Sequence, residues 1–115
     1  MPKVLLVEDE ADLLSLVSES LDLHGMTVIQ ATSGSEALDA LKNAGPFDAV
    51  ISDIVMPGDL TGIDVAQEAL KMQAGVHVIL TSGQPQSHFP PLPKSAVFLS
   101  KPYRVKQLIE MLRER

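Results

Sequence analysis

The sequence predicts an α/β fold in which five short strands form a parallel sheet and helices cover both of its faces. Two patterns favour this fold class. Short apolar runs alternate along the chain with segments whose apolar residues recur at helical spacing. The runs also lack internal alternation with polar residues, as do strands that are buried on both faces. The chain has 115 residues, 45% of them hydrophobic, which is enough for one domain that we expect to span residues 1–115.

The first strand and the first helix are predicted at the start of the chain. The run KVLLV, residues 3–7, is apolar and contains β-branched residues, so it is the best candidate for the central strand. From Ala11 onward, leucines and valines recur at the spacing of one helix face. Gly25 follows this face where a left-handed C-terminal cap is expected, so it should end the helix.

The next unit repeats the pattern. The run MTVIQA, residues 26–31, predicts the second strand, and SGSEALDALKNAG, residues 33–45, predicts the second helix. We expect Ser35 to be the N-cap of this helix, because a serine hydroxyl accepts a hydrogen bond from an amide of the first turn. The run DAVIS, residues 48–52, predicts the third strand.

The second half of the chain adds two strands and two helices. GIDVAQEALKMQAG, residues 62–75, predicts the third helix, and VHVILTS, residues 76–82, predicts the fourth strand. The fifth strand is expected at AVFLS, residues 96–100. RVKQLIEMLRER, residues 104–115, then carries its apolar residues on one side of a closing helix.

The segment GQPQSHFPPLPKS, residues 83–95, interrupts the alternation of strands and helices. It contains four prolines, which remove amide donors and fix the backbone angle φ. A long regular helix therefore does not fit between the fourth and fifth strands. We expect a loop or a short distorted turn there instead.

Composition excludes several classes of function. Nine Lys and Arg residues stand against fifteen Asp and Glu residues, and the net charge of −6 argues against binding to nucleic acid or to an anionic membrane. The chain has no cysteine, so it has neither a disulfide nor a thiolate metal site. Acidic residues follow Val7 and break the first apolar run, which is atypical of a signal peptide or a membrane span. We expect a cytoplasmic protein whose partners are proteins or cations.

Three acidic residues are expected to meet at one edge of the predicted sheet. Glu8 and Asp9 directly follow the first strand, and Asp53 stands at the tip of the third. The carboxyl ends of parallel strands share one edge, where open α/β sheets bind their ligands. Carboxylates held close together raise one another's proton affinity unless a cation compensates them. The cluster therefore predicts a divalent cation, and Mg²⁺ suits such oxygen ligands.

Hydroxyl groups and a lysine should reach the same edge. Thr81 and Ser82 end the fourth strand, and Lys101 follows the fifth. Carboxylates, a cation site, a hydroxyl and an ammonium group together are typical of phosphoryl chemistry. Asp53 would be the nucleophile that attacks phosphorus, while the cation and Lys101 neutralise charge on the phosphoryl oxygens.

Each of these residues also has a structural interpretation when it is taken singly. Glu8 and Asp9 could begin a helix, where acidic residues are favourable. Asp53 could form a turn before the Met-Pro-Gly sequence, and Lys101 could be a solvated surface lysine. Their convergence on one edge from separate strands favours the functional interpretation over these alternatives.

Four short blocks resemble the signature blocks of response regulator receiver domains, the phosphoacceptor half of two-component signalling. They are LLVEDE, SDIVMPG, VILTSG and FLSKPY, and each closes a separate predicted strand. The resemblance runs in order over nearly the whole chain. It implies a flavodoxin-like (βα)5 doubly wound sandwich with strand order 2-1-3-4-5, in which the fourth helix is short or disrupted here. It also implies a donor that carries phosphohistidine, either a histidine kinase or a histidine phosphotransfer protein.

The resemblance implies a role for each residue of the metal site. Asp53 would be phosphorylated and would contact Mg²⁺. Asp9 would be a direct metal ligand, and Glu8 would act through water. The backbone carbonyl of Val55 would complete the metal contacts of the protein.

The resemblance also implies a phosphoryl-binding and switching group. Thr81 would move to bond the phosphoryl group, Ser82 lies next to it, and Lys101 would pair with the phosphoryl oxygens. Phe98 matches an aromatic residue whose rotamer couples to the threonine, although a core position is its more usual role. The chain would assist its own phosphotransfer and dephosphorylation without being an enzyme that acts on a separate product.

Two departures from the usual receiver pattern bear on the partners. The loop MPGDLTGID, residues 56–64, is one residue longer than the commonest version and resembles receivers of hybrid histidine kinases. The proline-containing segment 83–95 replaces most of the helix that belongs to the usual output surface. The output protein or attached domain that reads the phosphorylated state is therefore left open.

Two other functions fit the same architecture, a flavodoxin-like binding domain and a small aspartyl phosphohydrolase. A flavin phosphate needs a hydroxyl and glycine-rich loop after the first strand, where this chain has the acidic sequence EDEAD. A phosphohydrolase that used Asp53 would require a second acid two residues later, where this chain has Val55. Both alternatives are therefore less favoured than the receiver.

Overall fold

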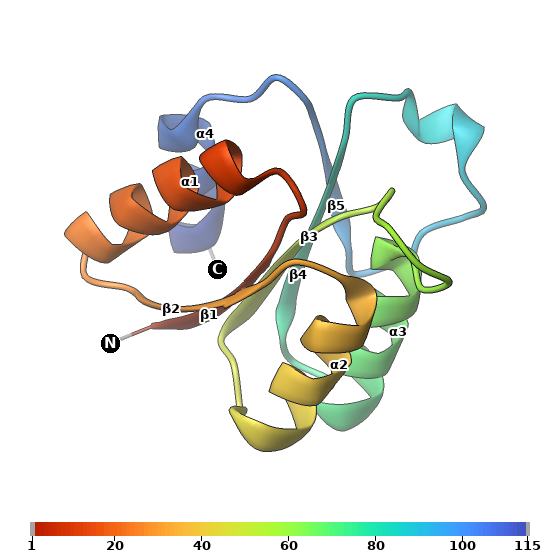
Figure 1. Ribbon diagram of the computed structural model, residues 1–115, viewed down its shortest axis with the longest axis horizontal. Helices are drawn as coiled ribbons and strands as arrows, with labels where there is room; N and C mark the ends of the chain where they lie inside the picture. The colour runs from red at the N-terminus through yellow and green to blue at the C-terminus, as the bar shows by residue number, and fades with distance from the viewer. Residues whose placement is uncertain (1, 115) are drawn as a thin grey trace.

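The computed structural model describes residues 2–114 and contains a five-stranded parallel sheet with the strand order β2-β1-β3-β4-β5. The strands are β1 (Lys3–Val7), β2 (Thr27–Ala31), β3 (Ala49–Asp53), β4 (His77–Ser82) and β5 (Val97–Ser100). The helices are α1 (Ala11–Leu23), α2 (Gly34–Asn43), α3 (Gly62–Met72), α4 (Val105–Arg113) and the 3₁₀ turn η1 (Gln86–His88). Helices α1 and α4 cover one face of the sheet, and α2 and α3 cover the other (Figure 1). The predicted flavodoxin-like fold and strand order are confirmed.

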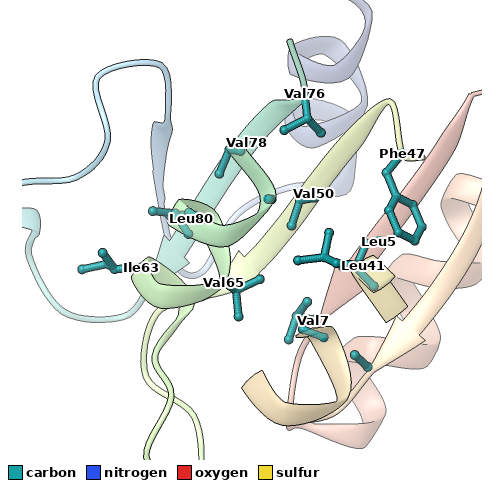
Figure 2. Close-up of a cluster of buried hydrophobic side chains, with 14 of the residues drawn as sticks. Leu5, Val7, Leu41, Phe47, Val50, Ile63, Val65, Val76, Val78 and Leu80 are labelled. Carbon is teal, nitrogen blue, oxygen red and sulfur yellow. The ribbon is translucent and has the colours of Figure 1, made fainter. Parts of the chain in front are cut away.

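Two hydrophobic clusters fill the two interfaces between the sheet and its helices. Successive residues of a strand point to opposite faces, so Leu5 joins the cluster beneath α2 and α3 while Leu6 joins the cluster beneath α1 and α4. Figure 2 shows the first cluster, in which Leu5, Val50 and Leu80 project from three neighbouring strands. Burial on both faces explains why these strands read as continuous apolar runs.

The second helix corrects one expectation from the sequence. Its N-cap is Ser33, whose Oγ accepts a hydrogen bond from the Glu36 amide at 3.2 Å, and Ser35 lies inside the helix. The Glu36 carboxylate reaches back to accept hydrogen bonds from the Thr32 amide and hydroxyl, both at 2.7 Å. These bonds lower the pKa of Glu36. The prediction placed the N-cap two residues too late. It did not consider that Glu36 can bond to both Ser33 and Thr32, which places the start of the helix at Ser33.

Other boundaries differ from the predicted ones by a few residues. Strand β3 extends to Asp53, since Asp53 is paired in register with Thr81 of β4. Gly25 has a φ of 84° and follows α1 as predicted. Helix α4 ends at Arg113, and position 115 of the predicted helix lies outside the described residues.

The proline-containing segment 83–95 forms the predicted loop, in which η1 is the short turn. Figure 1 shows it in cyan and light blue, passing beyond α3 on its way from β4 to β5. Phe89 and Leu92 are half-buried against the cluster under α2 and α3, whereas Pro90 and Pro91 are exposed. The loop is therefore anchored by two apolar side chains.

Across residues 2–114, we find no helix with the length and apolar character needed to cross a membrane.

Candidate functional site

The three predicted acidic residues meet at the carboxyl edge of the sheet. Strands β1 and β3 are paired with Val7 opposite Ser52, which brings Glu8 and Asp9 beside Asp53. One carboxylate oxygen from each of the three residues lies within 4.8 Å of the other two. Glu8 and Asp53 are buried, with 4% and 8% of their surface exposed, and Asp9 is exposed to solvent. The cluster therefore has two fixed acids and one that faces water.

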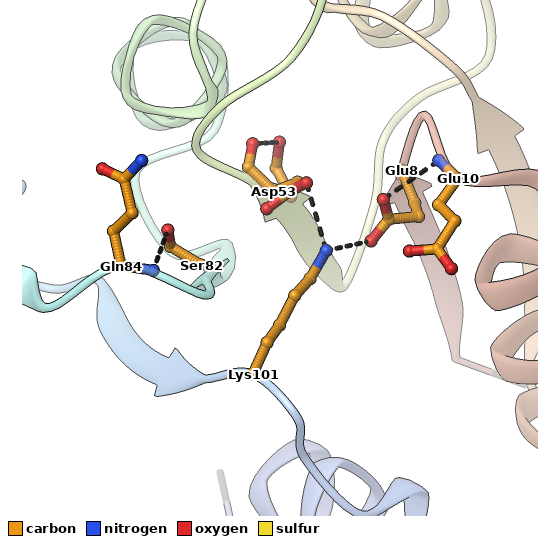
Figure 3. A network of polar contacts seen from close by, with 7 residues as sticks. Glu8, Glu10, Asp53, Ser82, Gln84 and Lys101 are labelled. Atoms are coloured by element: carbon orange, nitrogen blue, oxygen red, sulfur yellow. Dashed lines mark hydrogen bonds and ion pairs between the residues drawn. The ribbon is translucent and has the colours of Figure 1, made fainter.

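Lys101 joins the buried acids from the end of β5. Its Nζ donates to Glu8 Oε1 at 2.7 Å and to Asp53 Oδ2 at 3.1 Å, and Figure 3 shows the lysine extended between the two carboxylates. The Lys101 amide also donates to the Ser82 carbonyl at 2.8 Å, which fixes the start of the side chain. The peptide bond to Pro102 is cis. The remaining oxygen of Glu8 accepts a hydrogen bond from the Glu10 amide at 3.1 Å.

The site holds more negative charge than its lysine compensates. Burial and, after it, the charge of Glu8 raise the pKa of Asp53 to about 6, although Lys101 acts in the opposite direction. Burial favours loss of the Lys101 proton, but its bonds to Glu8 and Asp53 outweigh burial, so the pKa of Lys101 is raised. The site thus contains three carboxylates but only the one ammonium group of Lys101 to balance their charge. This donor set and its excess charge fit a divalent cation bound by oxygen.

The end of β4 lies beside the phosphoacceptor candidate. Thr81 is buried, is paired with Asp53, and accepts a hydrogen bond at its carbonyl from the Ile54 amide at 2.9 Å. Ser82 is also buried, and its Oγ accepts a hydrogen bond from the Gln84 amide at 3.0 Å. Figure 3 shows this bond apart from the contacts of Lys101. The Ser82 hydroxyl is thus engaged in the turn after β4.

Val55 and Phe98 are the remaining residues that were predicted for the site. Val55 stands two residues beyond Asp53, and 51% of its surface is exposed. Phe98 is half-buried on β5, is paired with Leu80, and packs against the cluster under α2 and α3. The structure therefore brings Glu8, Asp9, Asp53 and Lys101 together, and it leaves Phe98 in the apolar layer next to them.

Two residues near the site were not predicted from the sequence. Tyr103 is half-buried, and burial together with the charge of Glu8 raises its pKa to about 12. Its position after Lys101-Pro102 was the only sign in the sequence. Gly62 begins α3, and its Cα lies so close to the backbone of Asp53 that no side chain fits there. Nothing in the local pattern distinguishes it from an ordinary helix-starting glycine.

Comparisons with known proteins point to one family. The sequence model described as the response regulator receiver domain matches residues 4–113. Over 96% of its length the chain is 37% identical to a protein named sensor kinase CckA of Brucella abortus, and it spans only 12% of that protein. The chain therefore matches a small part of this curated relative.

Solved structures give the same result. The receiver domain of a hybrid histidine kinase CckA superposes with a TM-score of 0.82 at 31% identity, over 97% of this chain and 96% of that one. The response regulator TrrA of Thermotoga maritima, in complex with Mg²⁺ and BeF, gives a TM-score of 0.76 at 30% identity, over 97% of this chain and 99% of that one. One of these relatives is thus a hybrid-kinase receiver, in line with the resemblance of the loop at residues 56–64.

Proposed function

Because the chain belongs to the response regulator receiver family of two-component signalling, we propose that Asp53 accepts a phosphoryl group from phosphohistidine. One observation carries this assignment, since Asp53 both belongs to the carboxylate cluster and bonds to Lys101. An Asp53 oxygen attacks phosphorus, the N–P bond of phosphohistidine breaks, and an aspartyl phosphate forms. The histidine nitrogen keeps the bonding electrons and takes up a proton from solvent.

We assign the metal contacts to residues of β1, β3 and the loop after β3. Asp9 and Asp53 would bind Mg²⁺ directly, Glu8 would act through water, and the Val55 carbonyl would add a fourth contact. When it is bound, Mg²⁺ supplies positive charge that favours ionised Asp53 and the phosphoryl oxygens. The TrrA structure in complex with Mg²⁺ and BeF supports a magnesium-dependent site in this family.

Lys101 would exchange partners during the reaction. In the unphosphorylated protein its ammonium group is bonded to Glu8 and Asp53. An aspartyl phosphate presents new anionic oxygens, to which the same ammonium group can donate. Thr81, buried beside Asp53, would donate its hydroxyl proton to another phosphoryl oxygen. Ser82 would support this end of β4, and Phe98 would couple the change to the outer face of β5.

The proposed donor is a histidine kinase or a histidine phosphotransfer protein, which would meet the domain in the cytoplasm. The phosphorylated state would then be read by an output protein or an attached domain through a change of the interaction face. The domain would assist its own phosphorylation and dephosphorylation and would act on no separate product. We propose that the receiver unit extends over the whole of residues 1–115.

The assignment is tested with acetyl phosphate as a small phosphodonor. We expect Mg²⁺-dependent incorporation of one phosphoryl group per chain, seen by mass spectrometry, and none in the Asp53→Asn protein. Removal of Mg²⁺ with EDTA should abolish incorporation. Equal incorporation by both proteins, or none by the unsubstituted one, contradicts the proposal.

A further inference from the structure

The backbone of Ile54, the residue after Asp53, is held from two sides. Its amide donates to the Thr81 carbonyl of β4 at 2.9 Å, and its carbonyl accepts from the Gly62 amide of α3 at 2.8 Å. The Ile54 side chain is buried, with 1% of its surface exposed. Ile54 therefore ties the start of α3 to the end of β3. Asp53 and Val55, its two neighbours, are both among the proposed metal ligands.

Gly62 lies too close to the backbone of Asp53 and Ile54 to carry a side chain. A Cβ atom at Gly62 would lie 2.2 Å from the Asp53 carbonyl oxygen and 2.8 Å from the Asp53 carbonyl carbon. It would also lie 2.9 Å from the Ile54 Cα. All three are backbone atoms, which cannot rotate away as the tip of a side chain can. A residue with a Cβ therefore has to displace either the backbone of Asp53 or the start of α3.

The start of α3 is itself fixed by a capping box. The Thr61 amide donates to Asp64 Oδ2 at 2.8 Å, and Thr61 Oγ1 accepts from the Asp64 amide at 3.3 Å. Such reciprocal bonds stabilise the first turn of a helix, because they satisfy backbone amides that have no partner within the helix. The helix start thus resists displacement, and so does Asp53, which is hydrogen-bonded within the sheet. Strain from a side chain at position 62 would reach the phosphoacceptor.

We propose that Gly62 is a positioning residue for the phosphoacceptor. Its missing side chain lets α3 close onto the Asp53 backbone, and its amide fixes the Ile54 carbonyl. Together these contacts set where the Asp53 carboxylate and the Val55 carbonyl lie. The inference rests on the proposed function, in which both groups bind Mg²⁺ and Asp53 attacks phosphorus. A displacement of about 1 Å at a reacting group can reduce a rate by orders of magnitude.

Two other glycines provide matched controls for a Gly62→Ala protein. A Cβ at Gly34 would lie 2.5 Å from the Leu60 Cβ, so Gly34→Ala introduces a comparable collision directed at Leu60. A Cβ at Gly75 would meet no atom within 4 Å. Gly34→Ala therefore reports the effect of steric strain that reaches Leu60, two residues before Gly62, and not the backbone of Asp53. Gly75→Ala reports the effect of the added methyl group alone.

The first measurement is the maximal rate of Mg²⁺-dependent phosphorylation by saturating acetyl phosphate, at a temperature where circular dichroism shows each protein folded. We expect Gly62→Ala to lower this rate at least about ten-fold. Gly34→Ala and Gly75→Ala should stay within about three-fold of the unsubstituted protein. A folded Gly62→Ala protein that reacts as fast as the Gly34→Ala protein would overturn the proposal.

The second measurement is Mg²⁺ binding in the absence of a phosphodonor. Tyr103 is the sole tyrosine of a chain without tryptophan, and it lies half-buried near Glu8, so its fluorescence is a suitable probe. We expect Gly62→Ala to weaken Mg²⁺ binding at least about five-fold, with both control proteins unchanged. Equal Mg²⁺ affinity in all of them would overturn the proposal. If the unsubstituted protein binds Mg²⁺ but is not phosphorylated, the proposed function fails and this titration still decides the role of Gly62.

A fourth variant, Thr61→Val, covers the case in which Gly62→Ala does not fold. Thr61→Val removes the hydroxyl that accepts a hydrogen bond from the Asp64 amide, and it adds no atom against Asp53. Fraying of the first turn should loosen the bond from the Gly62 amide to the Ile54 carbonyl, so we expect phosphorylation to slow about three- to ten-fold. An unchanged rate in a folded Thr61→Val protein would then overturn the proposal.

Discussion

At pH 7 the carboxylate of Asp53 lies next to Glu8, with Lys101 as the bonded cation between them. Burial and the charge of Glu8 raise the pKa of Asp53 from 3.8 to about 6. The folded state therefore holds the Asp53 proton more tightly than the unfolded state does. The stability that this proton confers is complete below about pH 4 and is lost as the pH rises through about 6. Ionised Asp53 thus favours unfolding when no metal is bound.

We expect the Asp53→Asn protein to be more stable than the unsubstituted protein at pH 7 in EDTA. The pKa shift corresponds to at most about 3 kcal/mol, and solvent screening reduces the expected gain to about 1–2 kcal/mol. The difference should shrink as the pH falls from 7 to 4, because Asp53 then becomes neutral. Urea unfolding at several pH values measures it.

Added Mg²⁺ provides the control for this measurement. It should stabilise the unsubstituted protein and leave the Asp53→Asn protein nearly unchanged, since binding to the folded state alone raises stability. A stability difference that is independent of pH, or Mg²⁺ stabilisation of both proteins, would contradict the assigned cause.

Val55 and Gly83 lead us to expect a long-lived phosphoryl group. Val55 is half-exposed and apolar, and a Cβ at Gly83 would meet no atom within 4 Å, so neither residue offers a group to orient an attacking water. Val55→Asn or Gly83→Glu supplies such a polar group. We expect each substitution to shorten the half-life of the aspartyl phosphate several-fold, as measured by phosphate release. A half-life of only seconds in the unsubstituted protein would refute this expectation.

Among the helices, the start of α2 shows how a local motif decides an element boundary. Ser33 caps the helix, and Glu36 bonds back to Thr32. Ser35 is exposed in the first turn, where a serine contributes only its modest helix propensity. The two serines thus differ in energetic role although they lie two residues apart. This contrast gives a matched pair of variants.

We expect Ser33→Ala to lower the free energy of unfolding by about 1 kcal/mol, because an amide of the first turn loses its acceptor. Ser35→Ala should change it by less than about 0.5 kcal/mol in either direction. Urea denaturation of the two proteins provides the comparison. If Ser35→Ala were the more destabilising substitution, the cap assignment would be wrong.

Over the whole molecule, stability is distributed unevenly between the sheet and the proline-containing segment 83–95. The central strands are paired on both sides and covered by helices, whereas the segment makes short-range bonds such as the His88 amide to the Pro85 carbonyl and the Phe89 amide to the Gln86 carbonyl. Such backbone groups open without disturbing the core. The segment connects β4 to β5, in the position where the resemblance to receivers implies a helix of the output surface.

We expect amide hydrogen exchange at Ser87, His88 and Phe89 to be faster than at Val50 and Ile79 by several orders of magnitude. Exchange followed by nuclear magnetic resonance measures this difference. If the segment belongs to the output surface, phosphorylation should also change its exchange rates. Uniform protection across the segment and the sheet would contradict this account of the fold.

Much of the fold and part of the site were predictable from the sequence. Apolar runs and helical spacing determined the order of the elements, because side chains repeat every two residues in a strand and every 3.6 in a helix. Placement of Glu8, Asp9, Asp53 and Lys101 at strand ends followed from the same patterns and from the shared edge of a parallel sheet. These features depend on residues close together in the chain.

The tertiary structure alone decided the rest. Lys101 bonds to Glu8 across 93 positions of sequence, and that bond acts against burial and helps to raise the pKa of Lys101. The close approach of Gly62 to Asp53 likewise depends on how α3 packs after β3. Distances between atoms far apart along the chain are fixed by packing, which no local pattern encodes. The sequence determined which groups the site contains, and packing determined how closely they are held and how they titrate.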